Sequence, residues 1–540
     1  MFRSAARAGL VATLSLSLLS PVSSAHAAAL PDWTALETCA GALSPRVTLT
    51  ASGGFTVDDA VFGYHYDQSV LARTAWISPR TTDGVYALEA YGTMWMRSLL
   101  RAIQKAPDSA ARLDALVAKT AATLTWRPDN HVVTDIVWNE GTNLRRQEAL
   151  NCLYAVTPDV RLVPLIKAVS AANLDPRRYY GPPLKPPHNH GLMANMALLQ
   201  AGIELHRDDW VSAAISRTRV ALAGSFTRAG LSHEQSSAYH QSLVQKWSIA
   251  AATLHDSARP EAVTLAQTIQ ATLVRARAAL QHLLDPVGVP VLFGDQVGDR
   301  QAVVPQRTLL FVDKDAGVIT RRWSSSAPDD FVAARFGARR AMHGHEDRMS
   351  VVWWAGGRPV LVDPGTYTYV AGAARDWQRS IVAHSAPVAP SRSFAPRAPI
   401  AISGIRSGAT LQFTMTGKPF GVSQSRRVAV DPVRNSLALT DAATTPLNQV
   451  LQLDPRWRLV SLNPARSTAR FMDRTGASLC LTTNGRITSV LRGARGLAGG
   501  WVFSYPPSAR HPAARVIVSG GTRLITSLRI YGTSLTPWAP

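Results

Sequence analysis

The hydrophobic pattern of this chain changes its period once, near Asp299, and this change restricts the possible folds more than any other feature. Through residues 58–284, apolar side chains recur every three or four positions, which places them on one face of an α-helix. Through residues 309–530 they form short segments, rich in β-branched and aromatic residues, which are typical of strands joined by hairpins. The pattern predicts a helical region followed by an all-β region, with the boundary between Gly298 and Gln306.

The helical segments are amphipathic and their linkers are mostly short, so consecutive helices are expected to pack as antiparallel hairpins. Many such hairpins in series favour an α/α toroid or solenoid, of which we take the toroid, and the strands that follow favour an antiparallel β-sandwich. The expected fold class is α+β and multidomain, because 540 residues are too many for one hydrophobic core. We assign residues 28–300 to the toroid and residues 301–540 to the sandwich.

Residues 1–27 have the composition of a secretory signal peptide. Two arginines give a basic start, residues 8–19 are apolar but too few to span a bilayer, and Ala25-His26-Ala27 is a small-x-small cleavage site. We expect cleavage near Ala27 and secretion of the mature chain. No later stretch is apolar enough for a membrane helix, so no membrane partner is expected.

The cysteine count is odd, with Cys39, Cys152 and Cys480. Export to an oxidising compartment permits a disulfide, and three cysteines allow at most one pair. The sequence leaves the pairing open, and none of the spacings suits a metal.

The charge balance indicates an anionic partner. Lys and Arg number 57 against 36 Asp and Glu, giving a formal net charge of +21. Arginine binds carboxylates and sulfates through two parallel donors, which suits an acidic polysaccharide. No long Lys/Arg run marks a nucleic-acid patch, so nucleic acid is not the expected partner. The alternative is an arginine bias spread over the whole surface, and the oligomeric state is left open.

One stretch, residues 342–369, combines histidines with a carboxylate. His343 and His345 are two positions apart, so an extended backbone would place both imidazoles on one side. A predicted hairpin follows, and it would return Asp363 toward the histidines. Two imidazoles and a carboxylate suit a divalent transition metal such as zinc. An isolated H-x-H, by contrast, is more often a pair of surface histidines.

Three further clusters have ordinary explanations when each is taken alone. A proline-rich loop, residues 175–189, leads to Asn189 and His190 at the start of a helix, where Asn commonly serves as an N-cap. Tyr239 begins another helix within S-x-x-Y-H, where aromatic residues are ordinarily packing groups. His384 lies in a predicted strand, and a lone histidine there is more often structural than a ligand.

Taken together and in this order, these clusters resemble the heparinase II/III-like family of polysaccharide lyases, which is related to certain alginate lyases. The motifs cover about residues 186–388, and HGHEDRMSVVWWAGGRPVLVDPGTYTY is their most specific part. The resemblance implies that residues 28–300 are a lyase toroid and that residues 301–540 are the family's C-terminal sandwich. It assigns the following roles: the pair that meets a uronate carboxylate to Asn189 and His190, catalysis to Tyr239 and His343, and ligation of one structural zinc to His345, Asp363 and His384.

The implied reaction is β-elimination, in which a base removes the C5 proton of a uronic acid and an acid protonates the departing O4. Asn189 and His190 would offset the carboxylate charge, because the C5 proton is otherwise too weakly acidic. We expect Tyr239 to be the general acid, and also a base if its pKa is lowered, with His343 as base for the other C5 epimer. Asp347 is expected to support the metal histidine.

Two other functions are compatible with the residues. An α/α toroid also serves glycoside hydrolases, which need two carboxylates, and Asp135, Glu140 and Glu234 are candidates. A non-catalytic polyanion-binding protein with a structural metal is the other alternative. The sequence leaves open which uronic acid is cut, whether sulfates are recognised, and whether cleavage is internal or terminal.

Overall fold

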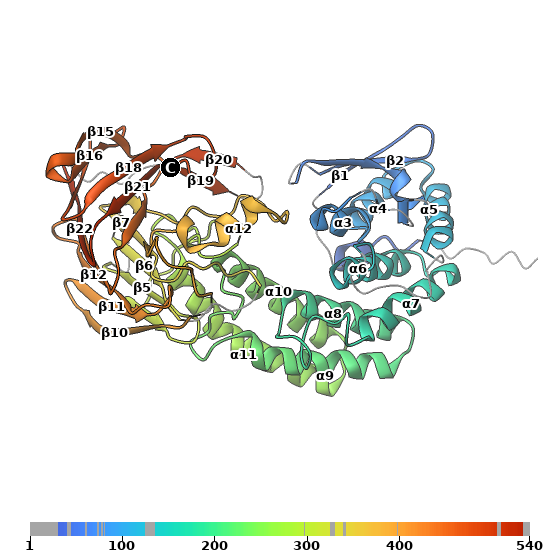
Figure 1. The fold of residues 1–540 in the computed structure, drawn as a ribbon. Coiled ribbons are helices and arrows are strands. Elements are labelled where there is room, and N and C mark those ends of the chain that lie inside the picture. The colour runs from blue at the N-terminus through green and yellow to red at the C-terminus, as the bar shows by residue number, and fades with distance from the viewer. Residues whose placement is uncertain are drawn as a thin grey trace, which may run out of the picture.

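The computed structural model describes residues 31–39, 45–59, 62–72, 75–76, 79, 81–124, 136–295, 297–324, 330–337, 342–396, 398–504 and 509–532. A helical region is followed by antiparallel sheets, as the change of period predicts (Figure 1). The predicted signal peptide and Asp135 lie outside the described residues. None of the helices described is long and apolar enough to cross a bilayer.

The helical region consists mainly of antiparallel neighbours. Its helices are α1 (Ala35–Thr38), α3 (Gly84–Ala90), α4 (Met96–Gln104), α5 (Ser109–Leu124), α6 (Glu140–Val156), α7 (Val163–Leu174), α8 (Asn189–Glu204), α9 (Asp208–Ser225), α10 (Ser237–Asp256) and α11 (Pro260–Leu283). Helix α8 packs on α9 and on α6, and α10 packs on α11 and on α8. In Figure 1 these four helices, α8–α11, lie between the first helices and the strands. The buried rings of Trp95 and Trp247 belong to the same apolar cluster, which continues through the helices.

The succession of helices that follows the short α1 begins later than its predicted start near Asp58. Between α1 and α3 lies a three-stranded antiparallel sheet, formed by β1 (Arg46–Leu49), β2 (Phe55–Asp59) and β3 (Tyr64–Asp67). The side chains of β2 alternate strictly between buried and exposed, which is the period of a strand covered on one face. Because the segment is short and lies beside long helical repeats, its strand pattern is difficult to recognise in the sequence.

A disulfide joins Cys39 to Cys152 on α6, with their Cα atoms 5.3 Å apart. This settles the pairing that the sequence leaves open. Cys480, on a strand of the large sheet, is a free thiol.

After residue 309, the strands that the structure describes form four antiparallel sheets. The five-stranded sheet contains β4 (Leu310–Asp313), β5 (Val318–Arg322), β6 (Phe331–Arg335), β7 (Val351–Ala355) and β8 (Arg358–Leu361). The eight-stranded sheet contains β10 (Ile400–Ser407), β11 (Leu411–Gly417), β12 (Gln424–Asp431), β13 (Ser436–Ala443), β15 (Arg458–Asn463), β16 (Thr468–Met472), β17 (Ser478–Thr483) and β22 (Arg523–Tyr531). The smaller sheets contain β9 (Pro387–Val388), β14 (Asn448–Gln452), β18 (Arg486–Arg492) and β21 (Ala514–Ser519), and β19 (Trp501–Ser504) with β20 (Ala509–Pro512).

The five-stranded sheet is covered on both faces, which explains the uninterrupted apolar run of β7. Val352 and Trp354 face a cluster that includes Phe293 and helical residues of α11. Val351 and Trp353 face the apolar core shared with the large sheet. This sheet therefore fixes the helical region against the β region, and the segments on either side of β7 are held at their junction.

Candidate active site

The site is built where the first turn of α8 and the first turn of α10 meet loops of the β region. Asn189 is the first residue of α8, and its backbone N–H donates to Glu234 Oε1 at 2.8 Å. The N-cap is His188 and not Asn189, because His188 Nδ1 accepts the backbone N–H of His190 at 3.0 Å. The Asn189 side chain therefore does not cap the helix, and its buried Oδ1 has no hydrogen-bond partner among the described atoms.

Tyr239 and His343 come from different halves of the chain and lie in contact. The N-cap of α10, Ser236, accepts the Tyr239 N–H at 3.1 Å and donates its hydroxyl to the Asp295 carbonyl at 2.6 Å. The Tyr239 ring stacks on the His343 ring with centroids 3.3 Å apart and planes at 9°. Tyr369, in the loop after Asp363, donates its hydroxyl to the Tyr239 oxygen at 3.2 Å.

A cluster of rings connects the start of α8 with this pair. The His188 ring centroid lies 4.6 Å from that of His190 and 5.6 Å from that of His343. His190 Nδ1 is 3.7 Å from Glu140 Oε1 at the start of α6. The structure therefore brings together the segments that carry Asn189, His190, Tyr239 and His343.

Glycine is required where the linker before β4 crosses this junction. Gly294 has φ +72°, and a Cβ there would lie 2.5 Å from the His343 carbonyl and 2.6 Å from the Gln235 carbonyl. The next residue, Asp295, donates its backbone N–H to the same His343 carbonyl at 2.9 Å. The main chain of the linker is thus fastened to the loop that carries the histidines.

The Asp295 carboxylate is fully buried and ionised. Burial opposes ionisation, but hydrogen bonds from Arg375, His343 and His345 hold the pKa of Asp295 well below its usual range. An ionised carboxylate only accepts hydrogen bonds, so the 3.3 Å contact with His343 is a bond donated by the imidazole Nδ1–H. The second nitrogen of His343, Nε2, then carries the lone pair in the neutral ring.

The same burial keeps the Tyr239 phenol protonated at rest. Burial raises the pKa of Tyr239, and the bond from Tyr369 and the charge of Arg375 offset this only in part. Burial also raises the pKa of Glu234 to about 7, although the Asn189 N–H opposes it. Glu234 Oε2 has no hydrogen-bond partner in the described part of the chain and lies 3.7 Å from His343 Nε2.

The predicted metal ligands lie together in the buried part of the loop region. His384 Nδ1 bonds Asp363 Oδ2 at 2.7 Å, and the rings of His345 and His384 have centroids 5.5 Å apart. Two imidazoles on one tetrahedral zinc would have centres roughly 5 Å apart. Buried nitrogens on both rings, His345 Nδ1 and His384 Nε2, have no hydrogen-bond partner among the described atoms. The types of these donors and the two free imidazole nitrogens suit a metal, but within the described residues no three such side chains converge on one point.

Two details of the predicted metal site are wrong. Asp347 does not support His345: it pairs with Arg335 at 3.4 Å, and Asp295 Oδ1 takes the His345 Nε2–H at 2.8 Å. His384 follows a 3-10 turn, Ile381–Ala383, and does not lie on a strand. Local spacing cannot reveal the partner of His345, because Asp295 lies fifty residues upstream in the chain.

Four side chains of the site received no role, or a different one, from the sequence. The sequence proposes Glu234 only for hydrolysis, Tyr369 lies within the most specific motif but has no role there, and Asp295 has no predicted role. Arg375, on α12 (Ala373–Arg379), lacks any motif, yet its guanidinium binds both Asp295 oxygens and covers the Tyr369 ring at 4.7 Å. For Asp295 the sequence offers one signal, which is that this acidic residue directly follows a glycine, Gly294, in the linker between the two regions.

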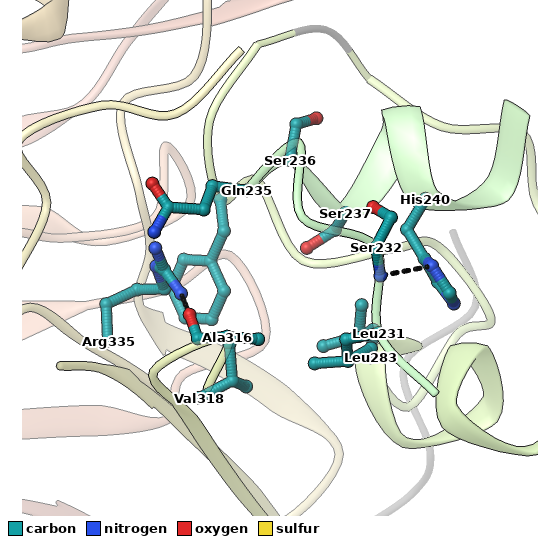
Figure 2. Close-up of a pocket in the computed structure, with 11 residues that line it drawn as sticks. Leu231, Ser232, Gln235, Ser236, Ser237, His240, Leu283, Ala316, Val318 and Arg335 are labelled. Carbon is teal, nitrogen blue, oxygen red and sulfur yellow. Dashed lines mark hydrogen bonds between the residues drawn. The ribbon is translucent and has the colours of Figure 1, made fainter. Parts of the chain in front are cut away.

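A small cavity lies behind the first turn of α10 and does not contain Tyr239. Its volume is about 20 Å³, room for one water molecule, and serines 232, 236 and 237 line it opposite Arg335 of β6 (Figure 2). His240 Nδ1 accepts the Ser232 N–H at 3.1 Å, so its Nε2–H donates to the Ala276 carbonyl at 3.0 Å. Burial lowers the pKa of His240 to about 4. This histidine is therefore a neutral packing group that anchors the turn carrying Tyr239.

Comparisons with known proteins place the β region in a family. Residues 331–530 match the family model described as heparinase II/III-like, C-terminal. This domain belongs to the heparinase II/III-like family. The matched segment includes β6, the hairpin β7–β8, Asp363 and His384, so the resemblance seen in the motifs is confirmed.

Solved structures extend the likeness from the β region to the helices. A heparinase III gene product superposes with a TM-score of 0.61 at 13% identity, covering 87% of this chain and 81% of that chain. The heparan sulfate lyase HepC from Pedobacter heparinus gives 0.59 at 14% identity, covering 93% and 83%. These likenesses establish a shared fold of helices followed by antiparallel sheets. No curated protein sequence matches the chain.

Proposed function

We propose that the protein is a polysaccharide lyase that cleaves a uronic-acid-containing acidic polysaccharide by β-elimination. The observation that carries the proposal is the stack of Tyr239 on His343 beside the first turn of α8. The matched family model and the fold shared with heparinase III support it. A net charge of +21 and the heparan sulfate lyase among the neighbours favour a glycosaminoglycan-like substrate over a neutral glycan.

The start of α8 is suited to the uronate carboxylate. The N-terminus of a helix carries a partial positive charge and favours anions. Asn189 and His190, in its first turn, would donate hydrogen bonds to the carboxylate and stabilise the enolate that forms when C5 loses its proton. Such aimed donors contribute on the order of 3–4 kcal/mol each to the transition state.

The two remaining groups divide proton transfer between them. Tyr239 holds a proton at rest and would donate it to O4 as the leaving sugar departs. His343 carries a lone pair on Nε2 and would accept the C5 proton of one epimer, whereas for the other epimer Tyr239 would have to act as base as well. A positioned acid or base contributes ~10²–10⁴-fold in rate.

Three further features complete the proposal. His345, Asp363 and His384 would hold one structural zinc, which would fix the loop that carries His343. The chain would be secreted after cleavage near Ala27. The helical hairpins would belong to an α/α toroid and the sheets to a β-sandwich.

The test is a panel of acidic polysaccharides assayed for the near-ultraviolet absorbance of a 4,5-unsaturated uronate. Wild type should produce this absorbance with at least one member, and Tyr239→Phe should lose it while remaining folded. Tyr531→Phe, an exposed tyrosine of β22, is the matched control and should retain full activity. Full activity of Tyr239→Phe would remove this residue from the mechanism.

Glycoside hydrolysis is the second candidate, because two carboxylates near the rings have opposite pKa shifts. Glu234 has a raised pKa, whereas the nearby His190 imidazole lowers the pKa of Glu140 against the effect of burial. New reducing ends without ultraviolet absorbance would identify a hydrolase. Binding without turnover, retained in Tyr239→Phe and His343→Ala, would indicate a polyanion-binding protein.

A further inference from the structure

One buried carboxylate binds the imidazole proposed for proton transfer and an imidazole proposed for the metal. Asp295 Oδ1 accepts His345 Nε2–H at 2.8 Å, and Asp295 Oδ2 accepts His343 Nδ1–H at 3.3 Å. Arg375 binds both oxygens, with Nη2 at 2.7 Å from Oδ2. Asp295 has no exposed surface, so hydrogen bonds from these side chains, and not from bulk water, stabilise its negative charge.

The contacts determine which nitrogen of each ring carries hydrogen. Because Arg375 donates to both oxygens of the Asp295 carboxylate, that carboxylate serves as an acceptor, and both imidazoles donate to it. His343 then presents the lone pair of Nε2, and His345 presents the lone pair of Nδ1, the nitrogen that is buried and unpartnered among the described atoms. A single charge thus selects the tautomer needed for accepting a proton and the tautomer needed for ligating a metal.

We propose that Asp295 is a positioning residue that sets the tautomers of His343 and His345 together and so links proton transfer to metal binding. This inference rests on the proposed lyase function for its catalytic half only. Arg375 fixes the carboxylate between the two rings, and the bond from Asp295 N to the His343 carbonyl fixes the distance from the main chain.

Asp295→Asn in the full chain tests the proposal. The amide keeps the size of the side chain, but its NH₂ faces one of the two imidazole N–H groups and forces that ring to turn or change tautomer. We expect kcat to fall roughly 10²–10⁴-fold with KM changed less than about threefold, as for loss of a positioned base. Zinc affinity, measured by competition with a chromophoric chelator, should fall about 10–100-fold.

Asp473→Asn is the matched control, since Asp473 is also buried and accepts a hydrogen bond from Arg358 Nε at 3.2 Å, at the turn end of the β7–β8 hairpin and away from His343 and Asp363. It should lower stability but leave kcat and zinc affinity unchanged. Wild-type kcat or wild-type zinc affinity in Asp295→Asn would overturn the joint role. The zinc measurement needs no turnover, so it separates a failure of this inference from a failure of the proposed lyase function.

Arg375→Gln provides a second variant in case Asp295→Asn does not fold. It keeps the carboxylate and removes the pair of donors that fixes it, so both kcat and zinc affinity should fall, each by less than in Asp295→Asn. A variant that folds and retains both values would overturn the proposal.

Discussion

At the scale of single residues, the site depends on two buried carboxylates whose pKa values shift in opposite directions. Asp295 has three cationic or N–H partners and stays ionised, whereas Glu234 has one backbone donor and retains its proton up to about pH 7. The number of donors therefore decides the charge of each group. The local sequence does not show this number, because the donors come from distant segments.

Glu234 makes stability depend on pH in a defined direction. Its pKa is about 7 in the folded protein, against the ordinary value of 4.5 expected in the unfolded chain, so the folded state binds the proton more tightly. The stability it contributes is complete below about pH 4.5 and is lost as pH rises through 7. Glu234→Gln should therefore gain stability relative to wild type between pH 5 and pH 8, by at most roughly 3 kcal/mol.

Denaturant unfolding at both pH values measures this difference. Glu261→Gln, at the exposed start of α11, is the control and should show the same stability difference from wild type at pH 5 and at pH 8. An equal difference for Glu234→Gln at the two values would contradict the assignment.

Tyr369 should increase the rate of proton transfer by Tyr239 through its hydrogen bond, without transferring the proton itself. Tyr369→Phe removes the hydroxyl that donates to the Tyr239 oxygen at 3.2 Å. A neutral hydrogen bond is worth about 0.5–1.5 kcal/mol, so kcat should fall about 2–13-fold with KM nearly unchanged. Initial rates on the preferred polysaccharide measure this. A loss as large as that of Tyr239→Phe would instead make Tyr369 the reacting phenol.

At the scale of elements, the sequence predicted the types of segment well and their contacts poorly. The long helices and the β7–β8 hairpin follow from strong local periodicity, which needs no knowledge of neighbours. The sheet β1–β3 was missed because its strands are short and lie beside a helical pattern. The sequence predicts the nearby Asp347 as the partner of His345, whereas packing of the linker brings Asp295 to it.

The cap of α8 gives a prediction at this scale. His188 accepts the His190 N–H, and Asn can do the same with its short side chain, whereas Ala cannot. His188→Ala should lower the free energy of unfolding by about 1 kcal/mol more than His188→Asn does. Thermal or denaturant unfolding of the two variants side by side measures it. Equal losses would mean that ring packing, and not the cap, is what His188 supplies.

At the scale of the whole molecule, the disulfide ties the first helical turn to α6 across a sequence separation of 113 residues. Closing so long a loop restricts the unfolded chain, so Cys39→Ser should lower the free energy of unfolding by about 2–5 kcal/mol. Thermal unfolding under non-reducing conditions measures this. Cys480→Ser removes a thiol that forms no bridge and serves as the control, with a change of less than about 1 kcal/mol.

The five-stranded sheet, apolar on both faces, has a consequence for how such a protein can be divided. Cutting the chain near residue 300 would expose an apolar face of this sheet to water in one fragment. In the other fragment, the first turn of α10 would lose the residues of the β region that pack against it. Neither fragment would own a complete set of reacting groups. The helical region and the β region are therefore expected to fold and to act only as parts of one chain.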